Sequence, residues 1–486
     1  MAKLSLGGLR MNLLLRSSPS RAFAPIVRRQ STAATAVKQQ YAEPSPAQDI
    51  AEQQQPSLVE LAATIKQETE KLDRYLKENG LAHPGFDVNS PANFPRLPEE
   101  MKKARETVIQ ATKELGDLVT GPTEGIRWMA WDHNNSLSLQ AVYHYNIAKS
   151  FPLDGTASYS TIAKAVGLDE VNVRRFMRHA MTNRIFKEVS PGIVAHTAAS
   201  RVLAEDQAMA DWVGFCVEDI MPAGSRVIKA LRAHPEASEP TRTGFCVAND
   251  TVDKEPMFVT FGKDPVRAKR MGGAMASLTG GEGYEVSYLV DNYDWQSVDS
   301  VPGGGLVVDI GGSHGFVCVD LAKRFKNMRF VVQDLPKTVA SAPDVGALSD
   351  RISFQAHDFH QLQPVQGADV YFYRWIFHNH STPYALNMLR QLIPALKRGS
   401  RIVINDYCLP PPNTTSTPSA EEKIMRTMDL VMLTLLNAQE RTEEDFRRLF
   451  AEASPGFVFK GVTRPAGCRM SIVEAVWEGE DAHAAA

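Results

Sequence analysis

The sequence predicts an α/β protein in which a doubly wound, mostly parallel sheet follows a mainly helical N-terminal part. The first observation is that strand and helix patterns alternate from residue 306 to residue 405, at roughly 20 to 30 residues per unit, as in parallel sheets with crossover helices. The second is a pair of strand patterns at residues 457–462 and 470–477. Because only a short turn separates them, these two strands must form an antiparallel hairpin at the end of the sheet.

Length and composition exclude several classes of protein. The chain has 486 residues, 43% of them apolar, so two or three domains with a sizeable core are expected. Lys and Arg number 53 against 56 Asp and Glu, which argues against a dedicated polyanion binder. No apolar run approaches the roughly 20 residues that span a bilayer. The cysteines are widely spaced without a CxxC pair, as expected of a reduced intracellular protein: Cys216, Cys246, Cys318, Cys408 and Cys468.

The N-terminal segment has a composition of its own. Residues 1–42 contain no Asp or Glu, but seven Lys or Arg and seven Ser or Thr. This composition is typical of a mitochondrial transit peptide, and a disordered tail is the equally weighted alternative. The expected localisation is therefore intracellular, either cytoplasmic or mitochondrial. Residues 43–56 are polar and contain prolines, as expected of a linker.

The next part of the chain is predicted to be helical. Apolar residues at helical spacing indicate helices over 58–76 and 99–119, the second of which ends at Gly121-Pro122. Three more helices and two short strands follow: 137–150, 160–166 capped by Ser160 or Thr161, 169–182, 184–189 and 192–196. Three helices and a hairpin predict a winged helix-turn-helix.

A winged helix raises the question of DNA binding. The helix at 169–182 carries Arg174, Arg175 and Arg178, which is where a recognition helix would have its basic residues. Asp169 and Glu170 flank those arginines, and the turn of the hairpin carries no basic residue. DNA binding is therefore kept only as a minor alternative.

The remaining helical part and the domain boundaries follow from composition. Residues 200–300 are expected to be mainly helical and are rich in Met and Phe, which form cores and also line pockets for flat apolar ligands. The predicted division is a tail and linker at 1–56, N-terminal helices at 57–136, a winged-helix and pocket region at 137–300, the sheet domain at 301–478 and a tail at 479–486.

The sheet domain begins with a continuous apolar run at 306–310, which is typical of a buried strand. The predicted elements are strands at 306–310, 329–333, 352–355, 368–373 and 401–405, with helices at 316–325 and 383–396. The loop after the first strand has Asp309 and then Gly311, Gly312 and Gly315. It matches neither the GxGxxG fingerprint of dehydrogenases nor a P-loop, so a ligand with a carboxylate and a ribose is expected instead of a pyrophosphate.

Two further strand ends carry acidic residues. Asp334 ends the second strand and is placed to bind ribose hydroxyls, and Asp358-Phe359 follows the third and is placed for an adenine. Glycines after a strand are often only a tight turn, and single acidic residues are often helix caps. Together, however, the three strand ends indicate a nucleoside site at one edge of the sheet.

These motifs carry a resemblance. The strings VVDIGGSHG, QDLP, HDF, RWIFHNHS, IVINDYCLPP and QERTEEDF occur in one order along the sheet domain. Because of these strings, residues 137–478 resemble the caffeic acid O-methyltransferase type of S-adenosylmethionine-dependent enzyme, and specifically the fungal aromatic O-methyltransferases. A C-terminal hairpin is also what separates a methyltransferase sheet from a dinucleotide-binding one.

The resemblance implies roles for individual residues. It makes His378 the general base, with Asp406 and Glu440 as the two flanking carboxylates. It places S-adenosyl-L-methionine against a set of strand-end residues: Gly311, Gly312, Asp334, Asp358, Phe359 and Arg374. It also implies a homodimer, in which the winged helix serves dimerisation and closes the partner's pocket for a small aromatic substrate.

The sequence departs from the family pattern in three places. The glycine triplet reads Gly311-Gly312-Ser313, so its third position must accept a Cβ. The usual His-Asp-Trp reads His378-Asn379-His380. Asp406 stands where plant members have Glu, one methylene longer. None of these changes removes a group that the chemistry requires.

The chemistry explains why these residue types are needed. A phenol has a pKa near 10, so little phenolate exists at neutral pH. A His beside the hydroxyl accepts the proton as the oxygen attacks, which typically accelerates such reactions by about 10² to 10⁴. A neighbouring carboxylate orients the imidazole and stabilises the imidazolium.

Two other hypotheses remain open from the sequence alone. His357, His360, His378 and His380 have spacings that could suggest a metal site, although loops at strand ends do not hold such spacings on one face, and no metal is expected. The rival from another functional class is a non-catalytic winged-helix regulator or scaffold that senses S-adenosylmethionine. The intact set of His378, Asp406 and Glu440 favours the enzyme.

Overall fold

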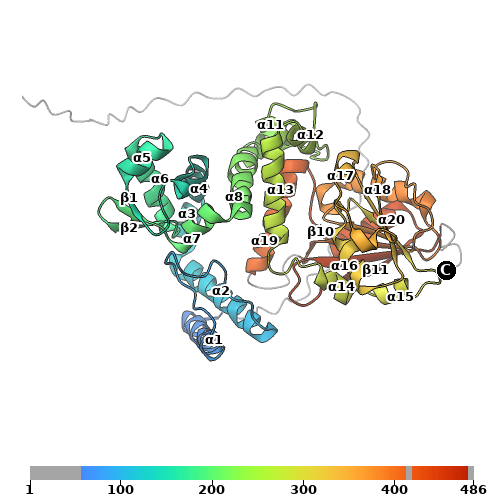
Figure 1. The fold of residues 1–486 in the computed structure, drawn as a ribbon, viewed down its shortest axis with the longest axis horizontal. Coiled ribbons are helices and arrows are strands. Elements are labelled where there is room, and N and C mark those ends of the chain that lie inside the picture. The colour runs from blue at the N-terminus through green and yellow to red at the C-terminus, as the bar shows by residue number, and fades with distance from the viewer. Residues whose placement is uncertain (1–55, 412–418, 480–486) are drawn as a thin grey trace, which may run out of the picture. The chain divides into compact units, whose positions relative to one another are not determined.

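The computed structural model describes residues 56–411 and 419–479 (Figure 1). The predicted transit-peptide-like segment at 1–42 and almost all of the linker lie outside the described residues, as does most of the C-terminal tail. Within the described ranges, no helix combines the length and the apolar character needed to cross a membrane.

The sheet domain contains a seven-stranded sheet in the order β11-β12-β8-β7-β4-β5-β6. All pairings among β4 to β8 are parallel, whereas β12 pairs antiparallel with both β8 and β11. The predicted fold class, including the C-terminal hairpin, is confirmed. The strands are β4 (Leu306–Ile310), β5 (Arg329–Asp334), β6 (Ile352–Ala356), β7 (Val370–Arg374), β8 (Arg401–Asp406), β11 (Phe457–Thr463) and β12 (Ser471–Trp477).

Alternate residues of the central strands build two separate cores. On β7, Tyr371 and Tyr373 face one core, and Val370 and Phe372 face the other. The first core packs the sheet against α18 (Thr382–Leu392) and α20 (Glu443–Ala453), and the second against α14 (Ser287–Asn292), α15 (Trp295–Asp299) and α16 (Phe316–Arg324). Helices therefore cover both faces, which explains why these strands read as continuous apolar runs (Figure 1).

The N-terminal helices agree with the prediction except for one additional helix. α1 (Leu58–Glu78) has a capping box between Ser57 and Glu60, and α2 (Glu99–Thr120) ends at Gly121, which has φ +75°. Pro122 does not only terminate α2, because it also begins α3 (Pro122–Met129). Proline suits the first position of a helix, where its missing N–H has no partner to lose.

The helices and the hairpin predicted between residues 160 and 196 are present. They are α5 (Tyr159–Val166), α6 (Glu170–Thr182), β2 (Lys187–Ser190) and β3 (Ile193–Ala195), preceded by α4 (His133–His144) and η1 (Ile147–Lys149). Three details differ from the prediction. The helix predicted at 137–150 ends at His144, and η1 follows after Asn146, which has φ +51°. The cap of α5 is Ser158, whose side chain accepts a hydrogen bond from the backbone N–H of Thr161, and not Ser160 or Thr161. β2 begins three residues late because Arg184 and Phe186 have positive φ angles.

A strand that the sequence did not indicate completes this small sheet. β1 (Thr156–Ser158) pairs antiparallel with β3, so the strand order is β1-β3-β2. Arg178 of α6 donates two hydrogen bonds of 3.0 Å to Glu188 of β2. This guanidinium is therefore already paired within the protein, which weakens the DNA-binding alternative.

The region between the two parts is helical, as predicted, and surrounds a buried charge. Asp219 is buried in η2 (Phe215–Ile220), a π-helix, and forms ion pairs of 2.8 and 2.7 Å with Arg267 and Arg270 of α13 (Pro265–Thr279). These pairs fix the π-helix against α13. The other helices are α7 (Ala198–Glu205), α8 (Gln207–Gly214), α9 (Met221–Gly224), α10 (Val227–Ala233), α11 (Gly244–Ala248) and α12 (Met257–Gly262).

α19 (Ala420–Leu436) joins this helical region to the sheet domain. Met432 packs with Phe215, Phe245 and Phe261, as a core residue does. Met425 belongs to a different cluster, with Tyr407 of the sheet domain. The methionines of this helix therefore contribute to two cores.

Asp299, at the end of α15, is the basis of a stability prediction. Its carboxylate is buried and accepts hydrogen bonds of 2.7 and 3.1 Å from the backbone N–H groups of Asn327 and Met328, just before β5. Asp299→Ala leaves these buried donors unpaired, so we expect the free energy of unfolding to fall by about 3 kcal/mol. Urea denaturation measures this change. The exposed Asp291 provides the control, since Asp291→Ala should alter stability by less than about 0.5 kcal/mol. Equal effects of the two variants would contradict the assignment.

Candidate active site

The parallel strands bring the predicted residues to one edge of the sheet. β5 and β7 lie on opposite sides of β4, and all three run in the same direction. In such sheets ligands bind outside the carboxyl ends of the strands, at the point where the strand order reverses. Here that point is the end of β4, where the glycine loop begins.

The glycine loop is held by the neighbouring strand β5. The backbone N–H groups of Gly311 and Gly312 both donate to the carbonyl of Gln333, at 2.8 and 3.1 Å. Gly311 has φ +72°, and a Cβ at this position would lie 2.4 Å from Cδ1 of Ile376. The third position of the triplet, Ser313, accepts its Cβ at φ +52°. A side chain at residue 311 would therefore be strained and would displace Ile376, whereas Ser313 already adopts the left-handed conformation.

Asp334 is fixed by the same loop. Its Oδ2 accepts a hydrogen bond of 2.9 Å from the N–H of Ser313, and its Oδ1 accepts one of 2.8 Å from Leu335. Asp334 is half-buried, so its carboxylate is held rigidly and is still partly open to solvent. Asp309, further down β4, is fully buried, and burial raises the pKa of its carboxyl to about 6.

Phe359 and Asp358 lie on the next loop. Phe359 packs edge-on against His380, with ring centroids 5.4 Å apart, and approaches Gly311. Asp358 is exposed, and its Oδ1 accepts a hydrogen bond of 3.0 Å from the N–H of His360. The structure therefore places both residues at the same edge as the glycine loop.

Arg374 differs from the other predicted cofactor residues in its contacts. At the end of β7, its guanidinium donates through Nη1 to Asn405 and through Nη2 to the carbonyl of Tyr284, at 2.7 Å. Both terminal nitrogens are thus engaged within the protein. Through them Arg374 joins β7 to β8 and to the segment just before α14.

His378 lies at the centre of the predicted catalytic set. It is 7% exposed, on the one-turn helix η4 (Phe377–Asn379), and its Nδ1 lies 2.9 Å from Oε1 of Glu440. Burial alone lowers the pKa of His378, but the charge of Glu440 and the hydrogen bond to it outweigh burial and raise this pKa above its ordinary value. Glu440 thus orients the ring and favours its protonated form.

Asp406 contacts His378 in a different way from the one expected. Its Oδ2 accepts a hydrogen bond of 3.1 Å from the backbone N–H of His378, not from the ring. Asp406 is completely buried, and this burial raises the pKa of its carboxyl to about 6. The two carboxylates therefore have different roles. Glu440 contacts the imidazole of His378, and Asp406 binds its backbone N–H.

Aromatic side chains that the sequence reading did not single out line the same site. The ring of Trp375 lies 5.0 Å from that of His378 and 5.1 Å from that of Tyr407. Tyr284 lies 5.9 Å from Trp375, and its hydroxyl is hydrogen-bonded to that of Tyr407. The RWIFHNHS and IVINDYC segments contain Trp375 and Tyr407, but nothing in their spacing showed that the rings meet.

Three buried polar atoms in this site have no hydrogen-bond partner within the described residues. They are Oδ1 of Asp406, Oε2 of Glu440 and Nε1 of Trp375. Trp375 also has φ +57°, a strained angle for a bulky residue. Buried polar groups are almost always paired, so such atoms indicate where a polar ligand group or water binds.

The four histidines are not arranged as a metal site. His380 Nδ1 is 2.8 Å from the carbonyl of Ile376, and burial lowers the pKa of this ring to about 4. His360 stacks edge-on with His380 and Tyr384. Among the residues that the structure describes, no group of three or more His, Cys, Asp or Glu side chains could hold a metal ion.

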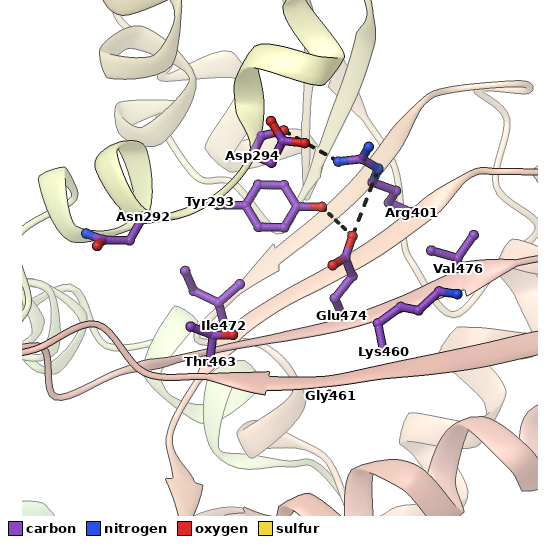
Figure 2. Close-up of a pocket in the computed structure, with 10 residues that line it drawn as sticks. All are labelled: Asn292, Tyr293, Asp294, Arg401, Lys460, Gly461, Thr463, Ile472, Glu474 and Val476. Atoms are coloured by element: carbon purple, nitrogen blue, oxygen red, sulfur yellow. Dashed lines mark hydrogen bonds and ion pairs between the residues drawn. The ribbon is translucent and has the colours of Figure 1, made fainter.

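A separate cavity lies over β8, β12 and β11, beside the residues that follow α14 (Figure 2). It has a volume of about 420 Å³ and is lined by Arg401 of β8 together with residues of β11 and β12. Its polar groups bind one another: Tyr293 donates to Glu474 at 2.8 Å, and Arg401 lies 3.9 Å from Glu474 (Figure 2). Among the described residues, none of the buried polar atoms without a hydrogen-bond partner belongs to a residue that lines this cavity.

The fold and the site define the class of the protein. A seven-stranded sheet with a single antiparallel insertion, and a glycine loop and acidic residues at the carboxyl ends of its strands, is the arrangement of class I methyltransferases. Residues 275–458 match the O-methyltransferase domain family. The crystal structure of OxaC in complex with sinefungin and meleagrin has the same fold, with a TM-score of 0.65 and 23% identity over 85% of this chain and 99% of that one.

Sequence relatives identify the family. A chlorophenol O-methyltransferase of Trichoderma longibrachiatum is 53% identical over 422 residues, which cover 86% of this chain and 90% of that protein. The O-methyltransferase of the grayanic acid biosynthesis cluster of Cladonia grayi is 37% identical over 87% of this chain and 88% of that protein. The chain belongs to the fungal O-methyltransferases. The prediction of an S-adenosylmethionine-dependent O-methyltransferase is thus confirmed at the level of the family.

The burial of Asp406 leads to a prediction about stability and pH. The carboxyl has a pKa of about 6 in the folded protein and near 3.9 when unfolded, so folding favours the protonated form. The energetic penalty of its charge therefore appears as the pH rises from about 4 to 6 and stays constant above that. Asp406→Asn removes this penalty, and we expect a gain in unfolding free energy of up to about 3 kcal/mol at pH 8 and about half of that at pH 5.

Urea denaturation at the two pH values measures this difference. The exposed Asp291 is again the control, because Asp291→Asn should give the same small change at both values. A loss of stability in Asp406→Asn at pH 8 would show that the charged form is the one the fold requires.

Proposed function

We propose that the protein transfers a methyl group to a phenolic hydroxyl of a small aromatic molecule, with His378 as the general base. The observation that carries the proposal is the 2.9 Å contact between Nδ1 of His378 and Glu440, beside the ring of Trp375. Because Glu440 occupies Nδ1, the other ring nitrogen, Nε2, is the one that meets the substrate. The hydroxyl proton passes to Nε2 as the oxygen attacks, and Glu440 stabilises the resulting imidazolium.

The residues at the strand ends fit S-adenosylmethionine. This cofactor supplies a methyl group already activated on a sulfonium. Asp334 is half-buried, and two backbone N–H groups fix its carboxylate in a position suited to ribose hydroxyls. Phe359 offers an apolar ring for the adenine, beside the exposed Asp358. Gly311 and Gly312 let the backbone approach the amino-acid part, and Arg374 supports the site from β7.

The substrate class is supported by the lining of the site. Trp375, Tyr407 and Tyr284 form an apolar aromatic wall, and buried oxygen and nitrogen atoms without partners lie beside the base. Such a site suits a flat ring that carries a hydroxyl. The relative with 53% identity is named for chlorophenol, and we propose simple phenols, including halogenated ones, as the acceptors.

We further propose that the enzyme is a homodimer. α3 buries none of its eight residues, although three of them are large and apolar. Together with its neighbours in sequence it exposes an apolar patch formed by Val119, Ile126, Trp128, Met129 and Trp131. A monomer rarely exposes so many adjacent large apolar side chains, so a second copy of the chain is the proposed cover.

We propose an intracellular location, either mitochondrial or cytoplasmic, from the composition of the N-terminal segment. Residues 1–42 are free of Asp and Glu and rich in Arg, as mitochondrial transit peptides are, and a cytoplasmic enzyme is the alternative. The N-terminal sequence of the protein isolated from its own cells distinguishes the two.

The role of His378 can be separated from folding and cofactor binding. We expect His378→Gln to lower kcat by about 10² to 10⁴, because the phenol then lacks its proton acceptor. Calorimetric titration with S-adenosylhomocysteine should give an unchanged Kd in this variant, whereas Asp334→Ala should weaken that binding. The exposed His83 provides the matched control, since His83→Gln should keep full activity. Undiminished turnover in His378→Gln would remove it from this role.

The dimer proposal predicts a change of mass. Ile126 is 68% exposed in the patch, and Ile126→Asp should shift the mass measured by light scattering from two chains to one, because a buried aspartate destabilises the interface. Ile228, which is 63% exposed on α10, gives the matched control, and Ile228→Asp should remain a dimer. A wild-type protein of single-chain mass at micromolar concentration would refute the proposal.

A further inference from the structure

A buried arginine lies directly behind the segment that carries His378. Arg441 is 2% exposed, and its guanidinium donates through Nη1 to the carbonyl of Phe377 and through Nη2 to the carbonyl of His380, both at 2.7 Å. These two carbonyls lie on either side of His378 in the chain. The planar fork of the guanidinium therefore fixes both ends of the turn that presents the imidazole.

This arrangement is costly, which argues against an incidental contact. Burial lowers the pKa of Arg441 to about 10, so the group is still charged at neutral pH. Within the described residues, no carboxylate lies within 4.0 Å of it to form an ion pair. A buried cation without a direct counterion persists only where its hydrogen bonds and more distant charges compensate for lost hydration.

The backbone around Arg441 is itself held in place. Arg441 begins β10 (Arg441–Thr442), which pairs in parallel with β9 (Cys408–Leu409) just after Asp406. The N–H of Glu440 donates to Asp429 at 2.8 Å, and Thr442 caps α20. One dipeptide, Glu440-Arg441, therefore supplies the carboxylate for the imidazole and the guanidinium for its backbone from a fixed position.

We propose that Arg441 is a positioning residue for the general base, which rests on the function proposed above for His378. Glu440 sets the orientation of the ring, Asp406 binds the backbone N–H, and Arg441 binds the two flanking carbonyls. The positive charge of Arg441 also opposes protonation of His378. The charged groups that face His378 are Glu440 and Asp406, which favour its protonation, and Arg441, which opposes it. The neighbouring His380 has a pKa of about 4 and is therefore uncharged at the pH values where His378 gains its proton.

Two substitutions of Arg441 separate its positioning of the His378 turn from the effect of its charge. Arg441→Gln removes both, so we expect kcat to fall by on the order of 10²-fold, as small misplacements of reacting groups do. The acid limb of the pH profile of kcat/KM should also move to higher pH, because a positive charge near His378 is lost. Arg441→Lys keeps the charge but not the fork, so its kcat should fall by about tenfold while the acid limb stays at the wild-type pH.

The affinity for S-adenosylhomocysteine and the KM for the phenol serve as structural readouts. Both should stay within about twofold of wild type in a folded variant, since Arg441 contacts neither proposed binding site. Arg398 is the matched control, because it is a surface arginine paired with Glu478, and Arg398→Gln should keep wild-type kcat. If Arg441→Gln does not fold, Arg441→Lys carries the test, and a Lys variant with wild-type kcat would overturn the proposal.

A spectroscopic measurement separates this proposal from the one on which it rests. The Cε1 signal of ¹³C-labelled histidine, assigned with His378→Gln, gives the pKa of His378 without turnover. A higher pKa of His378 in Arg441→Gln supports the inference about Arg441, whether or not His378 is the general base. If His378→Gln were found active, only the assignment of His378 as the base would fail. An unchanged pKa and kcat in folded Arg441→Gln would show that Arg441 does not position His378.

Discussion

The hydrogen bond between His378 and Glu440 is the contact on which the rest of the site depends. It joins residues 62 positions apart in the chain, in an interior where both partners are almost completely buried. A buried imidazole is normally neutral, and a buried carboxylate alone would be unstable. Each partner therefore stabilises the charged form of the other, and the pKa of His378 is raised despite its burial. The surrounding structure acts to hold this pair in one geometry.

The site keeps polar atoms that a merely stable protein would not bury. Asp406 is fully buried, yet only one of its two carboxylate oxygens is bonded to His378. Trp375 has a strained backbone angle and an indole N–H without a partner. Strain and unpaired groups of this kind persist where the rest of the fold compensates for them. Here two well-packed cores, one on each face of the sheet, provide that compensation.

The sequence was sufficient for the parts that local patterns determine. The strands β4 to β8 and the hairpin β11–β12 lie where the sequence predicted them. The central strands β4, β7 and β8 are buried on both faces, and such strands leave a continuous apolar pattern. The residues of the site could be named because they follow those strand ends in sequence. What could not be read were contacts between distant segments. That Asp406 would bind the backbone of His378 and not its ring depends on how η4 turns, which no spacing encodes.

Arg441 shows the same limit more clearly. In the sequence it stands within QERTEEDF, beside several acidic residues, where a surface ion pair is the natural expectation. In the structure β10 pairs with β9, and Arg441 points inward to the carbonyls of Phe377 and His380. Missed short elements such as α3 and β1 have a related cause. The eight residues of α3 and the three of β1 show little periodicity of their own, and their neighbours decide their conformation.

The departure at His380 strengthens the assignment of His378, although it brings a second imidazole close to the site. A general base needs a pKa near the working pH and a free nitrogen that faces the substrate. Burial lowers the pKa of His380 to about 4, which makes it a weak base, and its Nδ1 is bonded to the carbonyl of Ile376. Its ring packs against Phe359, on the side proposed for the adenine. Two histidines only two residues apart thus have opposite electrostatic environments, because only His378 has a carboxylate partner. The difference between them lies in Glu440.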